Sequence, residues 1–151
     1  MRIRIAHSLE ELAPHQTAWD ALADARGLPL LQYAWFLSAE RHLAEPGSVR
    51  VVLVLDRNDS LIAVCALELR RDAAVRDSYQ LLGMARLYEP SGLLYRDPAG
   101  RNALLRALAG LDRPVVLARL WPDESTAAFE ARRVRLSRYA LLLGKYAAPS
   151  Q

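Results

Sequence analysis

The fold of this chain is decided by two apolar runs, Val49-Arg50-Val51-Val52-Leu53-Val54-Leu55 and Leu61-Ile62-Ala63-Val64-Cys65-Ala66-Leu67-Glu68-Leu69, which are joined by Asp56-Arg57-Asn58-Asp59-Ser60. Residues 51–55 are apolar at every position, which indicates a strand that is buried on both faces. The joining residues have the composition of a turn. We therefore expect the two runs to pair as an antiparallel hairpin at the centre of a sheet.

The segments before the hairpin predict a strand and two helices, over residues 1–6, 14–26 and 32–44. The first segment alternates polar and apolar residues, whereas the other two carry apolar residues at helical spacing. Ser8 and Glu11 have the spacing of a capping box, which predicts that a first helical turn starts at Ser8. Because proline strains a helix interior, we expect a break at Pro14.

The segments after the hairpin predict a loop and then alternating strands and helices. They are a charged loop over 70–78, strands over 79–82 and 93–95, a helix from 97, a strand over 115–120, a helix over 125–136 and a strand over 139–143. Asp97 and Pro98 favour a helix start, since aspartate caps helices well and proline fits the first helical position. We expect one domain over residues 1–146 and a loose tail over 147–151.

Composition limits the classes of function. The chain has 151 residues, 52% of them hydrophobic, and can therefore bury a core without disulfides or a metal. Every basic residue except Lys145 is an arginine, and the net charge is only +3, which favours a compositional bias over a nucleic-acid interface. Cys65 is the one cysteine, no histidine spacing suits a metal, and no segment resembles a signal peptide or a membrane span. These observations predict a cytoplasmic protein that binds neither metal nor membrane.

The order of the elements matches the GNAT acyltransferase fold, and several stretches resemble one branch of that superfamily. They are Trp19, Pro29-Leu30-Leu31-Gln32-Tyr33-Ala34-Trp35-Phe36, the two runs of the hairpin, and Leu81-Leu82-Gly83 after a basic loop. This progression resembles the first half of FemAB-like and CelD-type proteins over about Ala6 to Leu143. The resemblance implies an α/β fold with a mixed, mostly antiparallel sheet and helices on both faces.

The resemblance also implies a function. FemAB-like and CelD-type proteins look like two fused GNAT domains and transfer acyl or aminoacyl groups to amines of sugars, peptides or cell-envelope precursors. The present chain is similar to the amino-terminal half, which shapes the acceptor pocket, while a second GNAT half or a homodimer mate supplies acetyl-CoA or another acyl donor. The chain ends at Gln151, so it is either a domain of a longer protein or a stand-alone half. The alternative is a non-catalytic, degenerate GNAT-like module that dimerises or docks a partner.

Two stretches compete as the donor site that the resemblance implies. GNAT enzymes hold the pyrophosphate of acetyl-CoA at a helix N-terminus through the pattern Q/R-x-x-G-x-G/A. Gln80, Gly83 and Ala85 match this pattern, although the next predicted helix begins only near Pro98. The rival stretch, Arg96-Asp97-Pro98-Ala99-Gly100-Arg101-Asn102, directly precedes that helix. Its aspartate would repel phosphate and its proline removes a donor, so an ordinary capped helix start is the competing interpretation.

The bend over residues 86–92 carries the catalytic candidates. Glu89 is a candidate general base for the attacking amine, and Tyr88 or Tyr95 is a candidate acid that protonates the leaving thiolate. The same residues also suit a tight turn with a solvated glutamate. Gln32 and Trp35 are candidates for contact with the acceptor; the competing interpretations are a helix cap for Gln32 and a core position for Trp35.

Overall fold

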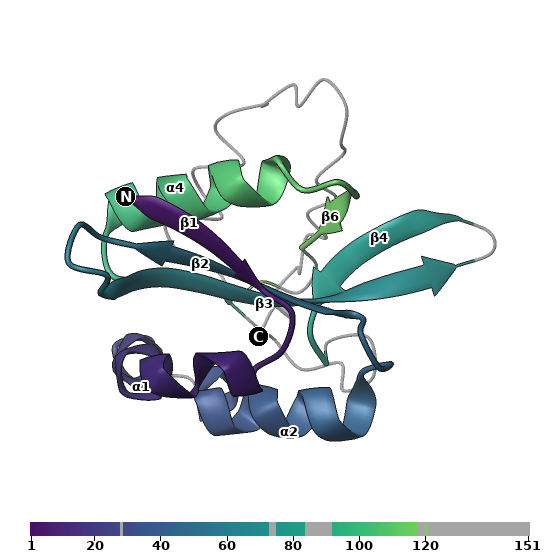
Figure 1. Ribbon diagram of the computed structural model, residues 1–151, viewed down its shortest axis with the longest axis horizontal. Coiled ribbons are helices and arrows are strands. Elements are labelled where there is room, and N and C mark those ends of the chain that lie inside the picture. Colours follow the sequence, from purple (N-terminus) through teal and green to yellow (C-terminus); the bar gives the residue numbers. More distant parts are fainter. Residues whose placement is uncertain (28, 73–74, 84–91, 118–119, 121–151) are drawn as a thin grey trace, which may run out of the picture.

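The computed structural model of the chain describes residues 1–27, 29–72, 75–83, 92–117 and 120 (Figure 1). In chain order its elements are β1 (Arg2–Ala6), the 3-10 helix η1 (Glu10–His15), α1 (Gln16–Asp24), the 3-10 helix η2 (Pro29–Leu31), α2 (Tyr33–Leu43), β2 (Val49–Leu55), β3 (Leu61–Asp72), β4 (Val75–Leu81), β5 (Leu94–Tyr95), α4 (Pro98–Ala109) and β6 (Val115–Val116).

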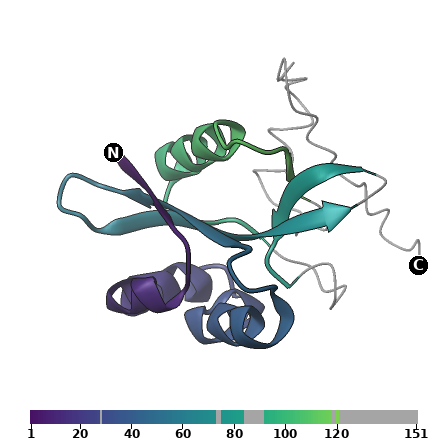
Figure 2. The same ribbon diagram turned by 45° about the vertical axis from the view of Figure 1, so that its right-hand side comes forward.

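The strands form one sheet between two helical layers. Four strands follow β1 in the order β2, β3, β4 and β6, and β5 pairs with β3. The described pairs are antiparallel except β4 with β6, which is parallel. Helices α1 and α2 cover one face and α4 covers the other (Figures 1 and 2). The predicted mixed, mostly antiparallel sheet with helices on both faces is therefore confirmed.

The predicted hairpin forms the centre of this sheet. Its strands β2 and β3 are antiparallel, and Leu53 lies opposite Val64. The side chains of β2 alternate between two cores: Val51 and Leu53 pack on the side of α1 and α2, whereas Val52 and Val54 pack on the side of α4. Because successive side chains of a strand point to opposite faces, an uninterrupted apolar run is what a sheet covered on both faces requires.

The predicted break before α1 is also confirmed. The N–H of Glu11 lies 3.4 Å from Oγ of Ser8, as in a capping box. The following turn is a 3-10 helix that contains Pro14, and the α-helix begins only at Gln16. Gly27 follows α1 at φ +67°, the left-handed conformation that ends many helices.

The charged loop predicted over residues 70–78 is wrong. Strand β3 continues to Asp72, and β4 starts at Val75 and pairs back along it. Arg70 lies opposite Ser78 in this pair, so backbone pairing carries the strand past the point where its side chains become polar. The change to polar residues at Arg70 therefore does not mark the end of the strand. The predicted strand over 115–120 is observed as Val115–Val116, and the elements predicted beyond residue 120 lie outside the described residues.

Strands β4 and β5 both pair with the same edge of β3, and we call the gap between these two strands the opening. Leu81 of β4 pairs with Leu67, and Leu94 of β5 pairs with Val64, so β4 and β5 follow the same edge in the same direction. Two β3 residues, 65 and 66, separate these pairs on one side, whereas twelve residues, 82–93, separate them on the other. Residues 84–91 of this segment lie outside the described residues. Among the described residues, no helix is long and apolar enough to cross a membrane.

Candidate functional site

Both described flanks of the opening lie against the start of the α2 layer. Gly83 follows β4 at φ +79°, and a Cβ added there would come within 2.7 Å of Cη2 of Trp35. A Cβ added to Gly92, before β5, would lie 3.4 Å from Cδ1 of Leu31. Gly83 and Gly92 thus lie against the first turn of α2 and against η2, and this region is the candidate functional site.

Trp35 lies at this site, whereas Gln32 is directed elsewhere. The Trp35 ring is half-buried and meets Phe36 edge to face, with centroids 4.9 Å apart. Gln32 is exposed, and its Nε2 donates to Oδ1 of Asp24 at 3.2 Å. Gln32 occupies the N-cap position of α2 but makes no capping bond with its side chain. The first N–H of α2, that of Tyr33, instead donates to Oδ1 of Asp20 at 2.8 Å, a cap from another helix that no local sequence pattern indicates.

Glu68 is a buried carboxylate on the side of the sheet that α1 and α2 cover, and it is not among the site residues predicted from the sequence. Only 2% of Glu68 is exposed. It pairs with Gln80 of β4 on one side and with Val49 of β2 on the other. Because Val49 belongs to the core under α1 and α2, and cross-strand neighbours share a face, Glu68 and Gln80 lie on the α2 side of the sheet. An isolated acid within an apolar strand is the sequence signal that identifies it.

Tyr95 is engaged at the start of α4 rather than beside Trp35 and Gly83. It lies opposite Ala63, and the guanidinium carbon of Arg26 lies 3.8 Å from the centroid of its ring. Arg101 of α4 approaches the same ring at 5.9 Å. These are cation–π contacts, which join the end of the α1 segment to α4 through Tyr95. Tyr88, Glu89 and Ala85 lie outside the described residues.

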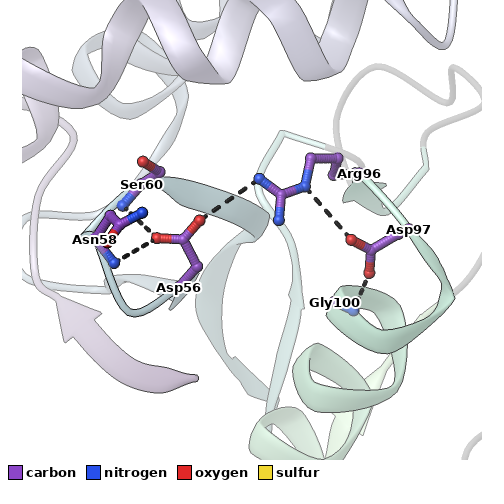
Figure 3. Close-up of polar contacts among 6 residues, drawn as sticks. All are labelled: Asp56, Asn58, Ser60, Arg96, Asp97 and Gly100. Atoms are coloured by element: carbon purple, nitrogen blue, oxygen red, sulfur yellow. Dashed lines mark hydrogen bonds and ion pairs between the residues drawn. The ribbon is translucent and has the colours of Figure 1, made fainter.

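The first described helix after Gly83 is α4, and its N-terminus is filled by the carboxylate of Asp97 (Figure 3). Oδ1 of Asp97 accepts from the N–H of Gly100 at 2.8 Å, and Pro98 has no N–H to offer. Nε of Arg96 lies 3.4 Å from Oδ2 of Asp97, and its Nη1 lies 3.6 Å from Oδ2 of Asp56. The ordinary capped helix start is therefore confirmed for this loop.

The same bonds stabilise the ionised forms of Asp97 and Asp56. The N–H of Gly100, with a smaller contribution from Arg96, lowers the pKa of Asp97. The N–H groups of Asn58 and Ser60 lower the pKa of Asp56 in the hairpin turn. Arg96 thus joins two ionised carboxylates, one from the hairpin turn and one from α4 (Figure 3).

We expect Asp97→Ala to lower the free energy of unfolding at neutral pH by about 1 kcal/mol, the usual contribution of an N-cap. Because the pKa of Asp97 is lowered by folding, this contribution is present above about pH 4 and is lost as the pH falls through the lower folded-state pKa. Urea unfolding of both proteins at several pH values measures the difference. Asp97→Asn, which caps but does not titrate, is the control and should retain most of the stability at neutral pH. A difference between wild type and Asp97→Ala that stays constant down to about pH 2 would contradict the assignment.

Cys65 offers no nucleophile under ordinary conditions. Burial raises the pKa of its thiol to about 12, so the reactive thiolate does not form near neutral pH. Across the residues that the structure describes, no three His, Cys, Asp or Glu side chains gather in a way that could hold a metal ion.

Two solved structures share this fold over nearly their whole length. One is described as a probable acetyltransferase; it superposes with a TM-score of 0.56 at 15% identity and covers 100% of this chain and 99% of its own. The other, from Arthrobacter sp. FB24, is described as a candidate acetyltransferase; its TM-score is 0.56 at 20% identity, with 98% and 96% covered. No family profile matches the chain, and no curated protein matches it. At these identities the likeness shows the fold alone, and that fold is GNAT-like.

Proposed function

We propose that this chain acts as the amino-terminal half of a FemAB-like N-acyltransferase, in which it shapes the acceptor site for an amine of a sugar, peptide or cell-envelope precursor. The observation that carries the proposal is the Asp97 carboxylate at the N-terminus of α4. A carboxylate that already accepts an N–H of the first turn repels a phosphate from that position. The acyl donor, acetyl-CoA or an aminoacyl donor, is then held by a second GNAT half, or by a homodimer mate at a position other than the N-terminus of its α4.

The proposed acceptor site is the opening between β4 and β5. Trp35 contributes an aromatic surface there, and Gly83 lets the backbone pass directly against it. Both similar structures are described as acetyltransferases, which supports acyl transfer as the reaction class. Donor binding by the motif of Gln80, Gly83 and Ala85 stays a prediction. Whether or not this motif binds the donor, the contact with Trp35 requires a glycine at position 83.

The proposed chemistry is attack of the acceptor nitrogen on the carbonyl carbon of the donor. A C–N bond forms and the bond to the leaving group breaks. Glu89 removes the proton that the amine loses, and Tyr88 or Tyr95 protonates the leaving thiolate. Tyr88 and Glu89 lie in sequence between Gly83 and Gly92, the two flanks of the opening, whereas Tyr95 lies on β5 beyond the second flank.

We expect Glu89→Gln to lower the rate of amide formation by roughly 100-fold, the low end of what a general base contributes. The assay incubates the chain with acetyl-CoA and a panel of primary amines, across a range of protein concentrations, and detects the amide by mass spectrometry. Because a homodimer mate would supply the donor, specific activity should rise with protein concentration. Glu45→Gln, a change of an exposed glutamate that precedes β2, is the matched control. An unchanged rate for Glu89→Gln would remove Glu89 from the mechanism, and absence of amide at every concentration would overturn donor supply by a homodimer mate.

A second candidate function is the non-catalytic interaction module, and the edge strand β1 favours it. β1 is the first strand of the described sheet and pairs with β2. Ile3 and Ile5 of this strand are each 44% exposed. An exposed apolar edge strand is a template for pairing with another chain. A calorimetric titration with acetyl-CoA and amines separates the two functions, since the module would bind neither.

A further inference from the structure

The two faces of the edge strand β1 differ in chemistry. Ile3 and Ile5 lie opposite residues of β2 that belong to the core on the α4 side, so they share that side. Arg2 and Arg4 lie opposite residues of the core on the side of α1 and α2. All the side chains of this strand are exposed except that of Ala6. The strand thus presents an apolar row on one side of the sheet and a cationic row on the other.

The outer edge of β1 can accept a further strand. β1 pairs with β2, and no other strand of the described sheet pairs with it. Alternate residues of an edge strand direct their N–H and C=O groups away from the sheet, where they can pair with another chain. Within the described ranges, the exposed large hydrophobic side chains are those of Met1, Ile3 and Ile5. The exposed apolar surface is therefore concentrated at the edge that is open to pairing.

A second copy of this chain fits this edge poorly. Side chains that lie directly opposite each other on two paired strands share a face of the sheet. In an antiparallel pair of two β1 strands, the register that aligns both isoleucines places Ile3 opposite Ile5 of the other copy. The same register places Arg4 opposite Arg4, and like charges at opposed positions are destabilising. The edge therefore favours a partner whose sequence differs from its own.

The cationic row of β1 selects carboxylates in that partner. Arg4 is exposed and forms no ion pair with the residues that the structure describes. Arg2, on the same face, lies 2.8 Å from Oδ1 of Asp59, so this row already meets one carboxylate at the surface. We infer that β1 binds an extended segment of another protein in which Asp or Glu alternates with β-branched apolar residues. The acidic side chains of that segment lie beside Arg4, and its apolar side chains cover Ile3 and Ile5.

This edge is separate from the proposed acceptor site. β1 lies along one edge of β2, whereas the opening lies along the far edge of β3. The inference therefore goes beyond acyl transfer, and it gives the non-catalytic interaction module a partner of defined chemistry. Because peptide binding and amide formation are measured separately, failure of either one leaves the other standing.

The test titrates the full chain into fluorescently labelled peptides and measures the Kd by anisotropy. One peptide alternates glutamate with valine, a second alternates lysine with valine, and a third has the composition of the first but carries its glutamates and valines in separate blocks. We expect the alternating acidic peptide to bind most tightly, because only it matches both faces of β1. Its binding should slow hydrogen exchange of the β1 amides, measured by NMR, since those groups enter a new strand pair.

The variant Arg4→Glu reverses the charge of the cationic row at an exposed position. It should weaken binding of the acidic peptide by about three- to tenfold, as a favourable cross-strand charge pair becomes a repulsive one. It should strengthen binding of the lysine peptide for the same reason. Arg71→Glu is the matched control: Arg71 is exposed on β3, which β2 separates from β1, so both affinities should stay unchanged.

Each other outcome overturns the inference in a distinct way. Equal affinity for the alternating and the block peptide, or an unchanged affinity in Arg4→Glu, would show that β1 does not read the partner strand. Binding of none of the peptides would identify the arginines as protection of an edge strand against aggregation. Protection of the β1 amides that rises with protein concentration, without any peptide, would assign the edge to a second copy of this chain.

Discussion

Replacement of Trp19 by alanine is expected to lower the free energy of unfolding by about 4 kcal/mol, as is typical for truncation of a buried tryptophan. Trp19 is 1% exposed and meets two other rings, Tyr33 at 5.7 Å and Phe36 at 5.4 Å between centroids. Its Nε1 donates to the carbonyl oxygen of Leu31 at 2.8 Å. The variant loses the ring contacts and leaves a buried carbonyl without its donor, so both effects act in the same direction.

Urea unfolding followed by circular dichroism measures this cost. Trp19→Phe keeps an aromatic ring but not the N–H, and should therefore cost less than Trp19→Ala by the packing contribution. Trp35→Ala is the matched control, because the Trp35 ring is only half-buried. A cost for Trp19→Ala no greater than that for Trp35→Ala would show that Trp19 does not anchor the α1 and α2 layer. Since domains are stabilised by only about 5–15 kcal/mol, the variant should also unfold at a clearly lower temperature.

Gly83→Ala is expected to cost about 2–4 kcal/mol for two separate reasons. At φ +79° an alanine is strained whatever space surrounds it. The new methyl group would in addition lie 2.7 Å from Cη2 of Trp35, and that ring is held in place by Phe36. The substitution must therefore displace Trp35 or the end of β4, which are the two sides of the candidate acceptor site.

The variant Gly27→Ala separates the cost of backbone strain from the cost of the clash with Trp35. Gly27 also has a positive φ, +67°, but nothing lies within 4 Å of an added Cβ, so its cost is strain alone, about 1 kcal/mol. We expect Gly83→Ala to exceed Gly27→Ala, and the excess to disappear when Trp35→Leu is combined with it. Equal costs for the two glycine variants, measured by urea unfolding, would mean that Trp35 yields freely to a Cβ at Gly83.

Several residues of the candidate site could be predicted from the sequence, but their arrangement in space could not. Gly83 was predicted for a donor loop and Trp35 for the acceptor, and the structure places them in contact. Their contact joins segments 48 positions apart in the chain, and no local pattern encodes such a pairing. Gln32 was predicted beside Trp35, yet its side chain points back to Asp24. A helical N-cap position does not determine where a long side chain finds its partner.

Features that depend on neighbours a few residues away could be predicted from the sequence. The hairpin of β2 and β3, the break near Pro14 and the Asp97 cap of α4 follow from apolar runs, ring geometry and capping chemistry. The tertiary structure was needed to find the extension of β3 and β4 past Arg70, the contact of Gly83 with Trp35, and the burial of Glu68. These depend on which strand or helix lies alongside. Pairing and burial are properties of the packed molecule, and the polarity of a residue alone does not specify them.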